Sequence, residues 1–378
     1  MKFDFPYIIE VLLLLGCAFF DTKPKYARMA RCCAYFFFFF FICCRARVVG
    51  GDTYDYVNYF TGASYYYLSG DQTLEPFFLL YNQFVHLFTN NDVVYVFLTS
   101  FLALFPIVFL VKRYSVNQSF SLALFFLIGP YVNYFAAFRQ MLGISWLLIG
   151  MICVLADARW KWVKFTIFAT LGYFTHHSIV IMAAIYLLCY FLKINRKFAI
   201  ICIACSALFG VVLKTFSVAD FIAVFSALNF GDLFGGRDSL YLARSLYTAD
   251  QVGPIFSMLS KSIWGVAIFY YSSKEDVEHW FVKIVLFYII ISNLFYTVPN
   301  VHRLTMGLSI FSIISYTWMF RNRKIRMKPV NFFSGLMCFL LIYMIYSFFV
   351  QTTLDANRMH PYYFFFEDYK FIPYPFER

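Results

Sequence analysis

Twelve continuous apolar runs dominate the sequence, and a chain with so many of them folds stably only where lipid covers its surface. Several runs are shorter than the roughly 17–25 residues that cross a bilayer as a helix, so their flanks or local thinning must help. Only 13% of the residues are charged, whereas soluble proteins carry about a quarter. Because the runs are continuously apolar, they favour helices over the alternating strands of a β-barrel. The runs are Pro6–Phe20, Cys32–Cys44, Val93–Val111, Phe120–Phe138, Met141–Ala156, Trp162–Phe174, Ile179–Leu192, Phe198–Leu213, Val252–Tyr271, Trp280–Val298, Leu304–Phe320 and Val330–Val350.

A thirteenth apolar run, Pro76–Phe88, has a different pattern. Glu75, Asn82, Gln83 and His86 recur at helical spacing, opposite a face of Phe and Leu. That pattern suits an interfacial or re-entrant helix rather than a spanning one. The sequence therefore predicts an all-α polytopic membrane protein with about 12 transmembrane helices and one further helix at 76–88, in a single domain over residues 1–378.

The positions of Lys and Arg predict the orientation. If Pro76–Phe88 does not span and the N-terminus lies outside, 19 of the 31 basic residues fall in cytoplasmic turns, as the positive-inside rule expects. Counting Pro76–Phe88 as a span would put Lys112 and Arg113 outside and invert every later turn. We therefore expect both termini outside, outer loops over 45–75 and 214–251, and an external tail over 351–378.

The basic residues predicted to face outside are mostly Arg. Arg suits bidentate contacts with phosphate or carboxylate groups, although snorkelling to lipid headgroups is the alternative. The candidates for an anion site are Arg45, Arg47, Arg139, Arg237, Arg244 and Arg303. The sequence does not say which of Arg45 and Arg47 points inward.

A series of short motifs lies on the predicted outer face. Arg45 to Tyr56 contains Gly-Gly-Asp, Glu75 precedes Pro76, and Arg139-Gln140 separates two apolar runs almost without a loop. His176-His177-Ser178 and His302-Arg303 follow later. In order and spacing this series resembles the EpsG-like family of Wzy-type polymerases of bacterial O-antigen and exopolysaccharide, over roughly residues 45–303.

The resemblance implies a glycosyltransferase in the bacterial inner (cytoplasmic) membrane, with its active site facing the periplasm or outside. Its substrate would be an oligosaccharide repeat unit on undecaprenyl pyrophosphate, and the lipid pyrophosphate would be the leaving group. No cofactor, metal or nucleic acid is expected. A flippase and a chain-length regulator of the same pathway are possible partners.

Such a transfer needs cations for the diphosphate and a base for the acceptor hydroxyl. The Arg residues, with Gln140 and His177, are candidates for substrate binding, and His176, Asp52 and Glu75 are candidates for the base. Each has a simpler interpretation. The His pair could cap a helix, Asp52 could form an ordinary turn, and Glu75 could be a charge at a helix N-terminus.

Two further features lie inside apolar runs. Lys261 sits near the middle of Val252–Tyr271, and an intramembrane charge is a functional hypothesis. It could line an acceptor cavity or pair with Glu10. Gly129-Pro130 is expected to kink its helix, which could open a cavity or merely serve packing.

Two other functions remain open at this point. A flippase for the same lipid-linked oligosaccharide would show internal repeats and charges throughout a cavity, and the sequence shows neither clearly. A ligase or another lipid-dependent glycosyltransferase would share the Arg-rich outer face.

Overall fold

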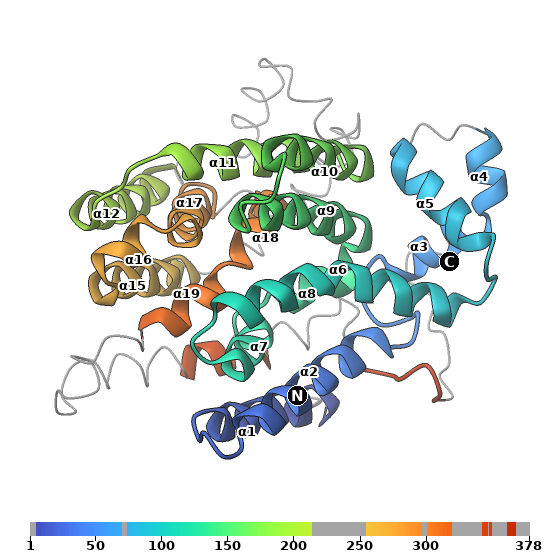
Figure 1. The fold of residues 1–378 in the computed structure, drawn as a ribbon, viewed down its shortest axis with the longest axis horizontal. Helices are drawn as coiled ribbons and strands as arrows, with labels where there is room; N and C mark the ends of the chain where they lie inside the picture. The colour runs from blue at the N-terminus through green and yellow to red at the C-terminus, as the bar shows by residue number, and fades with distance from the viewer. Residues whose placement is uncertain are drawn as a thin grey trace.

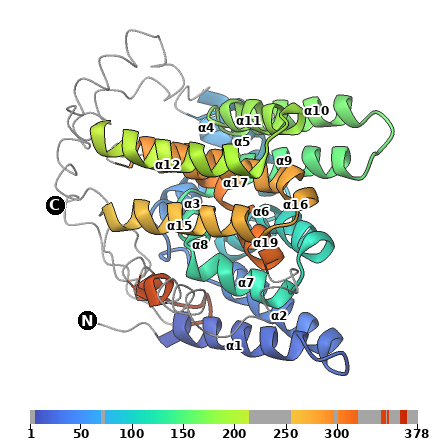
Figure 2. The same cartoon turned by 90° about the vertical axis from the view of Figure 1, so that its left-hand side faces the viewer.

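The computed structural model describes residues 5–69, 74–213, 255–296, 301–319, 342–346, 348–349 and 361–367, and within these ranges the regular structure is helical. The helices are α1 (Phe5–Asp21), α2 (Ala27–Cys43), α3 (Thr53–Thr61), α4 (Ala63–Ser69), α5 (Pro76–His86), α6 (Asp92–Tyr114), α7 (Gln118–Leu127), α8 (Pro130–Ala136), α9 (Phe138–Leu155), α10 (Lys161–Thr175), α11 (Ile179–Phe191), α12 (Arg196–Leu213), α15 (Ile255–Tyr271), α16 (Lys274–Glu278), α17 (Trp280–Leu294), α18 (Val301–Ser309) and α19 (Ser312–Trp318). Several of the longer helices, among them α1, α12 and α15, lie nearly parallel or antiparallel in Figure 2, whereas α4 and α5 are steeply inclined to α6 in Figure 1.

The described helices support the predicted class, and the number of spans stays a prediction. Two helices, α6 and α9, are long and apolar enough to cross a membrane by length and composition. Four shorter helical stretches are apolar, at Gln118–Leu127, Ile179–Phe191, Trp280–Leu294 and Leu304–Trp318.

Several turns predicted to face the cytoplasm contact one another at one end of the bundle. The backbone amide of Ser119 donates to Asp21, and the indole of Trp318 donates to the carbonyl of Tyr114 at 2.7 Å. Lys283 reaches the carbonyl of Leu192 at 2.8 Å. These contacts agree with the predicted alternation of the turns, whichever side of a membrane this end occupies.

The apolar run Phe120–Phe138 does not form one kinked helix as expected. It is broken into α7 and α8 at Gly129-Pro130, where Gly129 adopts φ 95°, and α9 then begins at Phe138. A side chain is disfavoured in this left-handed conformation, and Pro130 cannot donate the hydrogen bond that would continue the helix. The two residues therefore end α7 rather than bend it.

The predicted helix at 76–88 is present as α5, which runs from Pro76 to His86. Asn82 is buried and accepts a hydrogen bond from the Tyr95 hydroxyl at 2.9 Å. Phe78 and Val85 are buried on the same side, whereas Leu80 and Phe84 are exposed. The buried side of α5 is therefore mixed polar and apolar, and its exposed Leu and Phe side chains suit contact with lipid. The outer segment 45–75 is also not all loop, because it contains α3 and α4.

Helices α9 and α10 form a close antiparallel pair, visible in Figure 1. They approach at two glycines. A Cβ added at Gly172 would lie 2.9 Å from the carbonyl oxygen of Gly143, and one at Gly143 would lie 3.1 Å from that of Gly172. Small residues allow this approach in membrane helices. Because the glycines are each about one turn from a helix end, the pair brings Arg139 at the start of α9 close to His176 at the end of α10.

The chain segment 361–367 packs beside the end of α2. Arg45 and Phe364 form an antiparallel bridge, the amide of Ala46 donates to the carbonyl of Tyr363, and the ring of Tyr362 stacks on Phe41 at 4.4 Å. This part of the C-terminal segment therefore lies at the same end of the bundle as the Arg45–Arg47 loop.

We predict that reporter fusions will place these two ends on opposite sides of the membrane. Fusions after Arg113, Lys161 and Arg196 should report one compartment, and fusions after Asp55 and Glu367 the other, because the basic turns are retained in the cytoplasm. A shared compartment for Arg113 and Asp55 would mean that α5 spans and that the predicted alternation is wrong.

Candidate functional site

The site begins with Glu75, which directly precedes α5. Pro76 occupies the first turn of that helix and holds Glu75 in an extended conformation, with φ −69° and ψ 144°, because a residue before proline is excluded from the helical region. The amides of Phe78 and Leu79 bond the backbone carbonyl of Glu75 rather than its side chain. The carboxylate is therefore available for contacts with other helices.

Arg139, in the first turn of α9, forms the main contact of that carboxylate. Its Nη1 lies 2.5 Å from Oε2 of Glu75, and both side chains are largely buried, at 16% and 8% exposure. The guanidinium also lies 5.9 Å from the ring centroid of Phe78 in α5. A buried ion pair of this kind is costly to break from one side, because the remaining charge is left without a partner.

His177, in the turn between α10 and α11, contacts the same carboxylate. Its backbone amide donates to Oε1 of Glu75 at 3.4 Å, and its Nδ1 lies 4.0 Å from that oxygen. Glu75 thus connects three segments that are distant in the sequence: the start of α5, the start of α9 and the α10–α11 turn. In Figure 1 these elements meet beside α5.

His176 belongs to a chain of hydrogen bonds that fixes its tautomer. The amide of Gln140 donates to the hydroxyl of Ser178 at 3.0 Å, and that hydroxyl lies 2.9 Å from Nδ1 of His176. The backbone amide of Ser178 also donates to Nδ1 at 3.3 Å. A backbone N–H can only donate, so Nδ1 must accept, and the neutral ring then carries its proton on Nε2. In this arrangement His176 presents a donor rather than a base.

Arg45 points into the protein, where its side chain is only 1% exposed. Its guanidinium lies between the rings of Phe135 and Phe138, at 4.7 and 4.9 Å, and donates to the carbonyl of Ile42 and the hydroxyl of Ser100. Burial lowers the pKa of Arg45 to about 10, so the group stays protonated at neutral pH. It therefore puts a positive charge beside Phe138, the residue that precedes Arg139.

Arg47 and Asp52 lie on the same loop as Arg45. Arg47 is partly exposed and forms an ion pair with Asp92 at the start of α6, at 2.9 Å. Asp52 is at the N-cap position of α3, and its side chain does not cap the helix. Gly50 allows the loop to approach α8 closely. A Cβ at Gly50 would lie 2.1 Å from the carbonyl oxygen of Phe135, and its φ of 104° also disfavours a side chain.

The structure describes less of the other predicted anion-binding residues, Arg303, Arg237 and Arg244. The backbone of Arg303 lies in the first turn of α18. Arg237 and Arg244 lie outside the described residues. Among the described residues, no group of three or more His, Cys, Asp or Glu side chains is arranged as a metal site.

Sequence reasoning missed the glycine pair that assembles the site. Gly143 is four residues after Arg139, and Gly172 is four residues before His176. Small residues one helical turn from each motif were the available signal, since such residues mark close crossings of membrane helices.

A comparison with protein-family models matches residues 28–364 to the EpsG family. The chain belongs to the EpsG family. The match extends over nearly the whole chain, and it includes the segments that contribute Glu75, Arg139 and His176 and the residues up to Phe364, which bridges to Arg45. No curated protein and no solved structure shows significant similarity. Together with the apolar helices, membership of the EpsG family supports a membrane protein with a role in polysaccharide biosynthesis.

We predict that Gly172→Ala will disturb the site through the packing of α9 against α10. The added methyl group meets the backbone carbonyl of Gly143 at 2.9 Å and the side chain of Ile179 at 3.0 Å, so the helices must shift apart, at a cost of about 1–3 kcal/mol. Thermal unfolding in detergent should show a lower midpoint, and polymer formation in cells should fall.

Gly16→Ala in α1 is the matched control, because no atom lies within 4 Å of the added Cβ. It should leave both measurements unchanged. Equal stability and polymer formation in the two variants would show that the glycine approach does not assemble the site.

Proposed function

We propose that this EpsG-family protein is a polymerase that joins oligosaccharide repeat units carried on undecaprenyl pyrophosphate, at the outer face of the bacterial cytoplasmic membrane. The observation that carries the proposal is the buried cluster in which Glu75 bonds Arg139 and the His177 amide. It combines a cation suited to a diphosphate with a carboxylate suited to a hydroxyl proton.

The proposed reaction makes one bond and breaks one bond. The bond between the anomeric carbon of the growing chain and its diphosphate oxygen breaks, and that oxygen leaves with the electron pair. The hydroxyl oxygen of the next lipid-linked unit bonds to the anomeric carbon, and its proton passes to a base. Negative charge therefore develops on the diphosphate, while a proton is lost at the acceptor.

Arg139 is proposed to stabilise the leaving diphosphate, with Arg303 as a second cation. A guanidinium presents a planar set of donors that fits two phosphate oxygens at once. Such preorganised charge is worth most in a site that excludes water, and the side chain of Arg139 is largely buried.

Glu75 is proposed to take the acceptor proton. In the resting protein, Oε2 of the Glu75 carboxylate is bonded to Arg139. An arriving diphosphate competes for Arg139, and loss of that pairing frees this oxygen for the acceptor hydroxyl. Arrival of the donor would thus prepare Glu75 for the acceptor. Asp52 remains the alternative base.

His176 is proposed to act as a hydrogen-bond donor from Nε2, and Gln140 and Ser178 to hold its ring. Its Nδ1 already accepts from Ser178, so the imidazole is oriented to stabilise a developing negative oxygen. This role replaces the base suggested by the sequence. Arg45 and Arg47 are proposed to support the site, and Arg237 and Arg244 to bind substrate from the 214–251 loop.

Deletion of the gene tests the polymerase against the other functions. Loss of a polymerase should leave surface glycan with a single repeat unit, measured as band length on a gel. A deletion that abolishes surface glycan altogether would favour a flippase. Accumulation of full-length polymer on its lipid carrier would favour a ligase.

We predict that the double variant Arg139→Gln/Glu75→Gln will insert normally but make no polymer. The single variant Arg139→Ala leaves Glu75 buried without its cation, which costs about 3–5 kcal/mol, so its loss of activity is ambiguous. The double variant removes both charges together and avoids this cost. Membrane protein level and glycan chain length are the measurements, and normal chain length would remove the pair from the reaction.

Arg139→Lys is the companion variant. It keeps the positive charge but loses the planar fork, so it should insert at the level of the unsubstituted protein and rescue polymer only poorly.

We predict that His176→Ala will slow turnover by roughly 10²–10³-fold, the effect of removing one donor to a developing oxyanion. His176→Gln should recover much of this loss, because its amide nitrogen can donate near the position of Nε2. If His176 acts as the base, both variants should lose activity to the same extent, because neither replaces the basic imidazole. Equal losses would therefore identify His176 as the base. His177→Ala should have a much smaller effect, because its backbone amide makes the closer contact with Glu75.

A further inference from the structure

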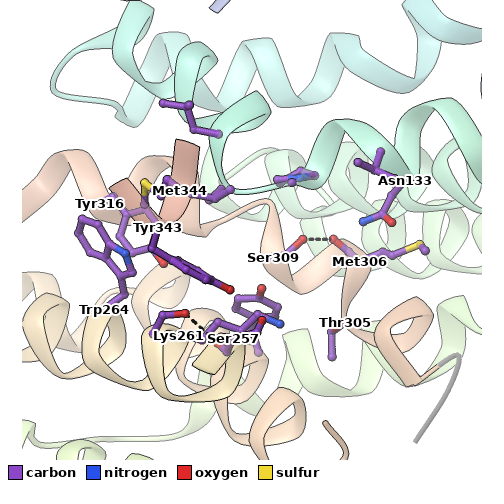
Figure 3. Close-up of a pocket in the computed structure, with 17 residues that line it drawn as sticks. Asn133, Ser257, Lys261, Trp264, Thr305, Met306, Ser309, Tyr316, Tyr343 and Met344 are labelled. Atoms are coloured by element: carbon purple, nitrogen blue, oxygen red, sulfur yellow. Dashed lines mark hydrogen bonds between the residues drawn. The ribbon is translucent and has the colours of Figure 1, made fainter. Parts of the chain in front are cut away.

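A cavity of about 300 Å³ lies inside the helical bundle, away from the Glu75 cluster (Figure 3). It is bounded by α8, α15, α17, α18 and α19 and by the segment that contains Tyr343. The volume is that of roughly ten water molecules at about 30 Å³ each. The cavity is therefore much larger than a packing defect.

The break between α7 and α8 forms one wall of this cavity. Leu127 to Pro130 line it, together with Asn133 from α8. Irregular backbone is tolerated within a membrane where it is buried in protein or lines a polar cavity. The position of the Gly129-Pro130 break is therefore consistent with a ligand-binding cavity beside it.

Lys261 is the charged residue in the lining. It is the seventh residue of α15, about 9 Å along the axis from Ile255, in an otherwise apolar helix. A charge at such a position is costly unless it is paired or solvated. The expected partner Glu10 does not bond it, and no described Asp or Glu forms an ion pair with it. Its closest charge interaction is with the ring of Tyr288, at 5.8 Å.

Trp264 provides a second donor on the same face of α15. It is 94% buried and lines the cavity, and its indole Nε1 has no hydrogen-bond partner within the part of the chain that the structure describes. Lys261 and Trp264 are three residues apart, so they point the same way from the helix. An ammonium and an indole N–H both only donate. Among the described residues that line the cavity there is no Asp or Glu.

We propose that this cavity is a second anion site, which binds the phosphate group of a polyprenyl-linked molecule. Lys261 supplies the charge, Trp264 a directed donor, and the hydroxyls of Ser257 and Thr305 further polar contacts. The apolar part of the lining, including Met306 and Met344, suits the first isoprene units. The identity of the lipid rests on the proposed function, in which two lipid-linked units must be held at once.

Helix α8 lies between the cavity and Arg45. Phe135 packs on Arg45 and accepts a hydrogen bond from Thr53 at the start of α3, whereas Asn133 lines the cavity. A molecule bound at Lys261 would therefore lie on the opposite side of α8 from Arg45, and directly before the chain enters α9 with Arg139.

Binding of farnesyl diphosphate to the full-length protein in neutral detergent tests the proposal. The measurement is isothermal titration, in the Arg139→Gln/Glu75→Gln background, so that the outer site does not contribute. Lys261→Gln should weaken binding at least about tenfold, and Trp264→Phe by about three- to tenfold, because it removes one neutral hydrogen bond. Lys261→Arg should keep most of the affinity, since it keeps the charge.

Lys274→Gln is the matched control, because Lys274 is exposed on α16 at the other end of α15. Farnesol should bind much more weakly than the diphosphate, inorganic diphosphate should compete at higher concentration, and phosphatidylglycerol should not compete. Equal affinity in Lys261→Gln and Lys274→Gln, or full competition by phosphatidylglycerol, would overturn the proposal.

The binding result does not depend on catalysis. Loss of binding in Lys261→Gln would support the cavity site even if deletion of the gene contradicted the polymerase. Unchanged binding would remove the cavity site and leave the outer Glu75 cluster untouched.

Discussion

The close approach of α9 and α10 at Gly143 and Gly172 is the constraint on which the site depends. Membrane helices gain little from the hydrophobic effect when they associate, so they rely on close packing. Here each glycine faces the backbone of the other helix. Because both lie one turn from a helix end, that packing also determines which turns meet. Arg139-Gln140 and His176-Ser178 become neighbours without any loop having to reach across.

Glu75 then connects this helix pair to the rest of the protein. Pro76 sets its backbone, and its two carboxylate oxygens contact different partners, Arg139 and the amide of His177. The arrangement is stable in the resting protein because the charges neutralise each other. A diphosphate carries more negative charge than one carboxylate, so in the proposed reaction it competes with Glu75 for Arg139. The same ion pair can therefore stabilise the fold and take part in the proposed transfer.

The second site follows from a different local event, the break at Gly129-Pro130. Leu127 to Pro130, at this break, line the cavity that also contains Lys261. Helix α8 lies between this cavity and Arg45. The proposed second site is therefore connected through one short helix to the segment that leads into α9.

The sequence by itself determined the helical class, because long apolar runs reflect a local cost that is lowest in lipid. Its short motifs also named Glu75, Arg139 and His176-His177 as candidates. Only the tertiary structure decided that Glu75 contacts Arg139 and the amide of His177, that Arg45 is buried while Arg47 pairs with Asp92, and that Asn82 of α5 is buried. It also decided the tautomer of His176, through a donor from Ser178. These outcomes depend on which neighbours supply partners, and that is decided by packing between segments far apart in the chain.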